Sequence, residues 1–157
     1  MRNYYLSIVL LTLCLAGCRG ISDTADRQVV GMTAREIIEK NVFIDLSDED
    51  LNPRTRSGSA PLAANPAFRA AVYRFYKKVT IDENNIAACH AKNAAELNMS
   101  EAMFNNCLNE MENLNEMIRN DMAKGIKGKR PPLNDDYFNR LLDESMYENA
   151  AFKRFTK

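Results

Sequence analysis

The chain has no excess of charge of either sign. Its 157 residues include 21 basic and 21 acidic side chains, so the formal net charge at pH 7 is zero. Domains that bind nucleic acid usually concentrate positive charge, because they must neutralise phosphates. The charge balance therefore gives no global electrostatic reason for binding nucleic acid, and we predict no nucleic-acid partner.

Glycine, proline and histidine are also scarce. With 6 Gly and 5 Pro, the sequence holds few of the residues that punctuate short strands and tight turns. No alternation of apolar and polar residues lasts more than a few positions, which favours helices. His90 is the only histidine, so a zinc site joining it to Cys89 and Cys107 would lack a fourth ligand. We predict an all-α fold that holds no metal or other cofactor.

No constellation of catalytic side chains is evident. Cys89 and His90 are adjacent, so on a helix their side chains would point about 100° apart, a poor arrangement for a nucleophile and its base. Asp143 and Glu144 are adjacent too, and make a poor acid and base pair for the same reason. We expect a protein that is not an enzyme. An enzyme whose carboxylates meet from distant segments is the least favoured alternative.

The one sustained apolar run lies at the N-terminus. Arg2 precedes an apolar stretch from Tyr4 to Leu15, and small residues follow it. A charged start, an apolar middle of about a dozen residues and a small-residue exit are typical of a secretory signal. The stretch is shorter than the run of about 20 apolar residues that spans a bilayer.

The end of this stretch, Leu15-Ala16-Gly17-Cys18, resembles the lipobox of bacterial lipoproteins. In that family the cysteine thiol takes a diacylglycerol, signal peptidase II cuts before the cysteine, and the new amino group is usually acylated. The resemblance implies that residues 1–17 are a signal peptide and that Cys18 carries a covalent lipid anchor. Arg19 stands where an Asp would favour inner-membrane retention in enterobacteria, which implies the outer membrane. A plain secretory signal with a chance cysteine, or an uncleaved apolar tail, is the alternative.

Two parts follow the signal. Residues 18–31 are interpreted as the lipidated N-terminus and a polar tether, and residues 32–157 as a single helical domain. Thr33 and Glu36 match a capping box, which predicts a short helix after Thr33.

The next stretch is acidic and then loop-like. The four acids from Asp45 to Asp50 lack the central glycine of a calcium loop, so we interpret them as a solvated turn. A loop over residues 52–64 should follow. Asn65 and Pro66 then suit the first positions of a helix. Its apolar stripe comprises Phe68, Val72, Phe75 and Tyr76, and its basic residues Arg69, Arg74, Lys77 and Lys78 are expected on solvated faces.

Two cysteines lie symmetrically about a predicted helix break. We expect one helix over 83–97, a break near Asn98 and a longer helix after Ser100. Cys89 and Cys107 are each nine residues from the break, so an antiparallel helix pair would place them at the same level. In an exported protein this predicts a Cys89–Cys107 disulfide that pins the helical hairpin. Two reduced, buried cysteines are the alternative.

The loop after the long helix holds the only concentrated group of basic residues. Gly125 ends the helix, and Pro131-Pro132 keep the next helix from starting early. Contact with an acidic partner or an anionic lipid surface is one interpretation. A solvated loop with charges that suit a helix C-terminus is the other. The candidate contact residues are Lys124, Lys127, Lys129 and Arg130.

The predicted fold is a small all-α bundle of about four to six helices, the last of which begins after Asn134, with one disulfide-pinned hairpin. For function we expect a lipid-anchored lipoprotein of the cell envelope, in the periplasm or at the cell surface, that contacts the membrane through its anchor. Its domain is expected to bind an envelope protein. An inhibitor or immunity protein against an enzyme that attacks the cell wall is the first alternative, and an unrecognised enzyme is the second.

Overall fold

The computed structural model describes residues 31–52 and 62–147. The predicted signal peptide, Cys18 and nearly all of the tether therefore lie outside the described residues, as does most of the loop predicted over 52–64. The described part is mostly helical and adds one small two-stranded sheet. Its elements, in chain order, are α3 (Ala34–Glu39), α4 (Asp48–Leu51), η1 (Leu62–Ala64), α5 (Pro66–Tyr76), β1 (Val79–Ile81), β2 (Ala87–Cys89), η2 (Ala94–Leu97), α6 (Glu101–Ala123) and α7 (Asp135–Leu141).

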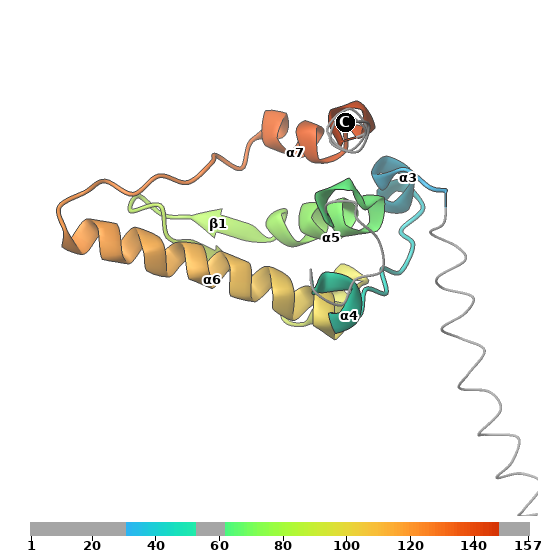
Figure 1. Cartoon of the computed structure of the whole chain (residues 1–157), viewed down its shortest axis with the longest axis horizontal. Helices are drawn as coiled ribbons and strands as arrows, with labels where there is room; N and C mark the ends of the chain where they lie inside the picture. Colours follow the sequence, from blue (N-terminus) through green and yellow to red (C-terminus); the bar gives the residue numbers. More distant parts are fainter. Residues whose placement is uncertain (1–30, 53–61, 148–157) are drawn as a thin grey trace, which may run out of the picture.

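The long helix α6 runs along the length of the described part of the chain (Figure 1). Helix α5 lies centrally, where it packs against α3, α6 and α7. The β1–β2 hairpin continues from α5 along α6, and α4 contacts α6 near its N-terminus. The chain after α6 turns back past the β1–β2 hairpin and reaches α7, which packs against α5 (Figure 1). No helix in the described ranges is long and apolar enough to cross a bilayer.

Side-chain caps start the helices at the positions that the sequence predicts. Thr33 and Glu36 form the predicted capping box of α3. The side chains of Asn65, Ser100 and Asn134 accept hydrogen bonds from the first turns of α5, α6 and α7. These predictions are confirmed, because each cap depends on residues only two or three positions apart. The acidic stretch before residue 52 is exposed, and within it Ser47 and Asp50 form a further capping box that starts α4.

The helix predicted over 83–97 is wrong. Residues 79–89 form an antiparallel hairpin in which Val79 faces Cys89 and Ile81 faces Ala87. The turn is built by Asp82, whose carboxylate accepts hydrogen bonds from the backbone N–H groups of Asn84 and Ile86 at 2.9 and 2.8 Å. Asn85 completes it with a φ of 65°, a conformation that asparagine tolerates better than most residues. Asp82 therefore caps a turn between two strands and does not start a helix.

The predicted disulfide is also wrong. Cys89 and Cys107 are both free thiols. Cys89 lies in β2, so the helical hairpin that a disulfide would pin does not form here. Burial raises the pKa of the Cys107 thiol to about 12, and the Cys89 thiol contributes to the same increase. Burial raises the pKa of the Cys89 thiol as well. Both thiols are therefore protonated and weakly nucleophilic at neutral pH.

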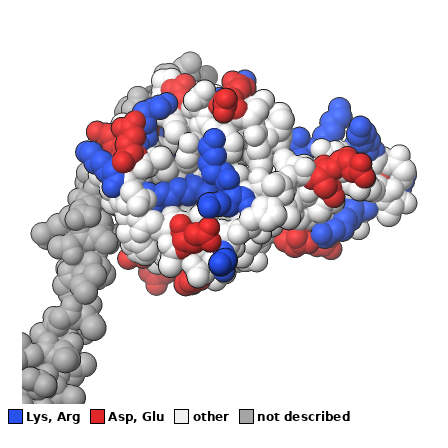
Figure 2. All heavy atoms as spheres, turned by 180° about the vertical axis from the view of Figure 1, so that it is seen from behind, with Lys and Arg blue, Asp and Glu red and all other residues white. Residues whose placement is uncertain are grey.

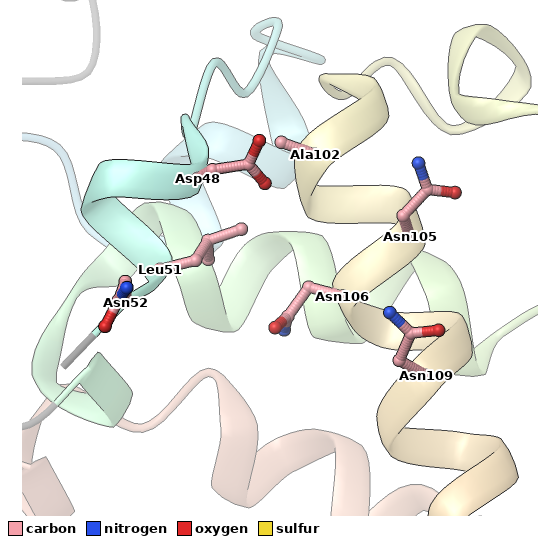
Figure 3. Close-up of a pocket in the computed structure, with 7 residues that line it drawn as sticks. All are labelled: Asp48, Leu51, Asn52, Ala102, Asn105, Asn106 and Asn109. Carbon is pink, nitrogen blue, oxygen red and sulfur yellow. The ribbon is translucent and has the colours of Figure 1, made fainter.

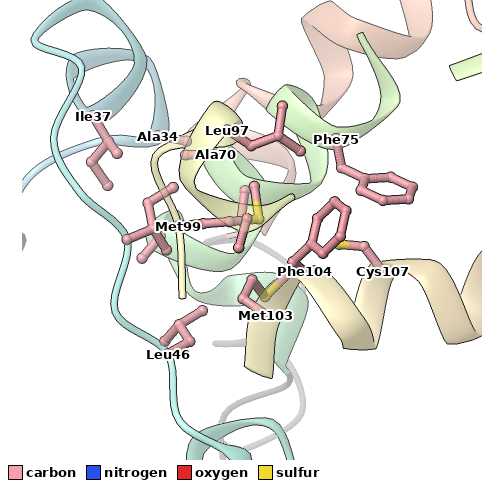
Figure 4. Close-up of a cluster of buried hydrophobic side chains, with 14 of the residues drawn as sticks. Ala34, Ile37, Leu46, Ala70, Phe75, Leu97, Met99, Met103, Phe104 and Cys107 are labelled. Atoms are coloured by element: carbon pink, nitrogen blue, oxygen red, sulfur yellow. The ribbon is translucent and has the colours of Figure 1, made fainter. Parts of the chain in front are cut away.

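The core lies where α3, α5 and the N-terminal half of α6 meet (Figure 4). Phe75 and Phe104 pack edge to face with ring centroids 5.9 Å apart, beside Met103 and Cys107. A parallel bridge between Ile44 and Met99 ties the segment after α3 to the start of α6. One face of α6 is buried from Met103 to Ile118, whereas Met122 is exposed. Asn115 is a buried polar residue on this face.

Two arginines predicted on solvated faces of α5 turn inward. Arg69 is buried and forms an ion pair with Glu144, while its remaining N–H groups donate to the carbonyls of Ala63, Ala64 and Leu141. Arg74 is half-buried, and its guanidinium donates to backbone carbonyls of four residues: Ile37, Val42, Leu97 and Asn98. Each arginine thus joins segments that are distant in sequence by satisfying their carbonyls.

Candidate functional site

The C-terminal half of α6 extends beyond the main core and leads into the loop that holds the predicted basic residues. We call the stretch from Glu112 to Leu133, which is this half-helix and the loop after it, the arm. The main core includes no residue of α6 after Met111. The arm lies at the narrow end of the molecule, far from α3 (Figure 1). It is fastened to the β hairpin by a network of polar groups.

Asn115 is the centre of this network and is 1% exposed. Its Oδ1 accepts from the backbone N–H of Ala87 at 2.8 Å and from Nη2 of Arg130 at 2.6 Å. Its Nδ2 donates to the carbonyl of Ala87 and to the carboxylate of Glu112, both at 2.9 Å. All the hydrogen-bonding capacity of this buried amide is therefore used.

Arg130 does not extend into solvent with the other predicted contact residues. Its Nε donates to the carbonyl of Asn85 at 3.1 Å, and burial lowers the pKa of its guanidinium. Nη1 is buried and has no hydrogen-bond partner among the described residues. The structure thus divides the four predicted residues: Arg130 holds the loop, and Lys124, Lys127 and Lys129 are exposed.

Gly128 brings the loop close to α6. A Cβ at this position would lie 2.8 Å from Cγ2 and 3.2 Å from Cα of Ile118. The carbonyl of Gly128 accepts from Nδ2 of Asn85 at 3.2 Å, which links the loop to the hairpin turn. Gly125, with a φ of 74°, ends α6 as the sequence predicts. The loop is therefore held in a defined path against the helix and the hairpin.

Charges of both signs occur across the surface. Figure 2 shows Lys and Arg side chains interspersed with Asp and Glu, and several basic side chains at the right-hand end, where the arm lies. Arg119 pairs with Glu112 at 2.6 Å on the arm. No uniform field of one sign covers this face, in keeping with the zero net charge.

A second candidate site is a groove of about 310 Å³ between α4 and α6. Asp48 and Leu51 border it on one side, and the amides of Asn105 and Asn109 border it on the other (Figure 3). The remaining lining residues are Asn52, Ala102 and Asn106. No sequence motif predicts this groove, and its only trace in the sequence is the group of three asparagines within five residues of one helix.

The groove is suited to hydrogen bonding. Each asparagine amide offers two N–H donors and one carbonyl acceptor, and carries no charge. Asn105 and Asn109 are four residues apart, so their Cα atoms are separated by about 6 Å along the helix axis. That distance is close to the roughly 6.7 Å between every second residue of an extended peptide. The same row continues to Asn113, one turn further along α6.

His90, the only histidine of the chain, is exposed, and its Nε2 lies 2.7 Å from Oγ1 of Thr80. Within the described ranges, no three His, Cys, Asp or Glu side chains are arranged to hold a metal ion. Burial raises the pKa of Tyr137 to about 12 and also raises the pKa of Tyr76. The two tyrosine rings pack edge to face with their centroids 6.0 Å apart. Cys18 lies outside the described residues.

Comparisons with known proteins add no relative to this picture. A scan against known protein families, a search of curated proteins and a search of solved structures each find no match for the chain.

Proposed function

We propose that this protein is a lipoprotein of the bacterial cell envelope, anchored through a lipid on Cys18, whose domain binds another envelope protein without catalysing a reaction. The Leu15-Ala16-Gly17-Cys18 motif supports the location. Two or three acyl chains on one cysteine give durable attachment, because a single chain binds membranes only marginally.

The observation that carries the binding role is the amide-lined groove between α4 and α6. Asn105 and Asn109 are spaced to hydrogen-bond with every second residue of an extended segment. Backbone N–H and C=O groups of such a segment match the donors and acceptors of the amides. The partner is thus a protein that offers an extended segment, and Asp48 at the rim favours one that carries a basic residue.

Affinity purification from solubilised envelopes tests the binding role. The full chain should capture one stoichiometric partner, and the double variant Asn105→Ala with Asn109→Ala should lose it. Asn120→Ala is the matched control, since Asn120 is exposed on the same helix outside the groove. Equal capture by the double variant would remove the groove from the proposal. Capture of nothing by the unaltered chain would contradict the binding role itself.

The identity of the partner tests the narrower alternative. A cell-wall enzyme that loses activity on binding would make this protein an inhibitor or immunity protein. The anchor has its own test: Cys18→Ser should abolish attachment of the lipid and block cleavage before residue 18, which increases the apparent mass of the chain. A variant that stays membrane-bound at unchanged size would contradict the lipoprotein assignment.

A further inference from the structure

Apolar side chains are exposed at the far end of the arm. Met117, Met122 and Ile126 are 63%, 43% and 55% exposed. Among the described residues, only two other large hydrophobic side chains are comparably exposed, and both lie elsewhere in the chain. We call Met117 to Lys129 the tip. Three of the five exposed large hydrophobic side chains of the described residues therefore lie at this end of the domain.

Exposed lysines are interspersed with these apolar side chains. Lys124, Lys127 and Lys129 are all exposed and lie next to or within three residues of Met122 or Ile126. The chain contains no acidic residue from Met122 to Asn134. The end of the tip is therefore both apolar and positively charged.

The tip is held in this form by the polar network beneath it. The backbone N–H groups of Lys124 and Ile126 donate to the carbonyl of Asp121 at 3.0 and 2.9 Å. Arg130 and Gly128 then hold the returning segment of the loop against Asn115 and Ile118. Because the loop is fixed, Ile126 is presented to the exterior and does not fold back onto α6. A preorganised surface loses little entropy when it binds.

We propose that the tip docks on the surface of a bilayer that contains anionic phospholipid. Its charged residues favour lipid over protein, because lysine is depleted at protein interfaces, whereas three exposed lysines lie among the apolar side chains here. Lysine attracts anionic headgroups, and an apolar side chain enters the boundary of the acyl chains. Each lysine near such a surface strengthens binding about fivefold.

Geometry allows the tip and the anchor to contact the same membrane. This part of the inference rests on the proposed lipid anchor. The 13 residues from Arg19 to Gly31 reach at most about 45 Å when extended. The 23 residues of α6 span about 35 Å. The tether is thus long enough for the domain to stand with the tip on the bilayer and α3 at its other end, away from the membrane (Figure 1).

Fluorescence of a single tryptophan tests the contact, because the natural chain contains no tryptophan. The full-length Ile126→Trp variant is reconstituted in vesicles of phosphatidylcholine alone or mixed with phosphatidylglycerol, with bromine on the acyl chains. In the mixed vesicles we expect a blue shift and strong quenching. Phe43→Trp is the matched control, since Phe43 is exposed at the opposite end of the domain and should not be quenched.

Three further results decide the inference. Replacing Lys124, Lys127 and Lys129 with Gln in the Ile126→Trp variant should weaken the contact on the order of a hundredfold and abolish the quenching. Absence of quenching in both kinds of vesicle would overturn the proposal and leave an acidic protein as the partner that contacts the tip. Equal quenching of the Phe43→Trp control would mean general adsorption, which also overturns it.

A separate experiment tests the lipid anchor independently of the tip. Flotation with phosphatidylcholine vesicles reports the anchor, since a neutral surface does not attract the lysines. Protein that floats while the Ile126→Trp variant is unquenched overturns the tip contact and supports the anchor. Quenching in anionic vesicles by protein that fails to float with neutral ones supports the tip contact and contradicts the anchor.

Discussion

Asn115 on α6 hydrogen-bonds to both backbone groups of Ala87 in β2. The N–H of Ala87 donates to Oδ1 at 2.8 Å, and Nδ2 donates to the carbonyl of Ala87 at 2.9 Å. Ala87 faces Ile81 at a position where the strands exchange no hydrogen bonds, so its N–H and C=O point away from β1. The asparagine amide therefore takes the place of a third strand. An isolated two-stranded hairpin is marginally stable, and this contact attaches it to α6.

Replacing Asn115 with leucine should destabilise the protein by roughly 3 kcal/mol. The substitution keeps the volume but leaves the N–H and C=O of Ala87 and one N–H of Arg130 without partners. Urea unfolding followed by circular dichroism measures the loss. Asn113→Ala, at an exposed position on the same helix, should change the free energy of unfolding by less than about 0.5 kcal/mol. Equal effects of the two substitutions would contradict a central role for the amide.

Replacing Arg69 with methionine should cost about 3 kcal/mol. Glu144 is 26% exposed and would lose its charged partner, and three backbone carbonyls would lose their donors. Lysine should not restore the lost stability, because one ammonium cannot reach all of these acceptors in the fixed geometry of a guanidinium.

Arg140 provides the control for this measurement. It pairs with Asp136 at 2.8 Å, but both side chains are exposed. Such surface pairs contribute at most about 1 kcal/mol. Thermal unfolding of Arg140→Met should therefore differ little from that of the natural chain. A large loss for Arg140→Met and a small one for Arg69→Met would reverse the assignment of the two ion pairs.

The capping box of α3 should make stability depend on acidic pH. Hydrogen bonds from the backbone N–H and the hydroxyl of Thr33 lower the pKa of Glu36. The folded protein thus favours the carboxylate. The stabilisation is present above the ordinary pKa of a glutamate and is lost as the pH falls through the lowered value. Glu36→Gln should therefore lower the thermal midpoint at neutral pH, and the difference should shrink at about pH 3. A constant difference would contradict this account.

The buried thiol of Cys107 should make the protein labile in alkali. The folded state raises the pKa of this thiol from 9.0 to about 12, chiefly by burial. Between those values the folded protein holds a proton that the unfolded chain has lost, so stability declines as the pH rises. Tyr137 shifts in the same direction. Cys107→Ala should therefore lose less stability than the natural chain between neutral pH and about pH 11, as measured by urea unfolding.

The cysteines also give a direct chemical readout. A thiol reagent should modify Cys107 in the native protein only after local or global unfolding, since the side chain is buried and protonated. In the denatured, unreduced protein both Cys89 and Cys107 should be modified, because both are free. Protection of both in the denatured chain would contradict the structure at this point.

The sequence by itself determined where four of the described helices begin and where α6 ends. Thr33, Asn65, Ser100 and Asn134 cap helices as predicted, and Gly125 ends α6. These signals depend on residues a few positions apart, which satisfy the backbone groups that a helix terminus leaves unpaired. For the same reason the basic residues after α6 were correctly predicted to form a loop.

Only the tertiary structure decided the fate of residues 79–97 and of the inward-facing polar side chains. The alanines at 87 and 88 have no local reason to form a strand, and their pairing depends on β1 and, for Ala87, on Asn115, 28 residues away. Arg69 and Arg130 are polar residues that a sequence pattern assigns to solvent. They turn inward because acceptors from distant segments bind several of their N–H groups: backbone carbonyls for both, a carboxylate for Arg69 and an amide oxygen for Arg130. Such partners are brought together only when the chain folds.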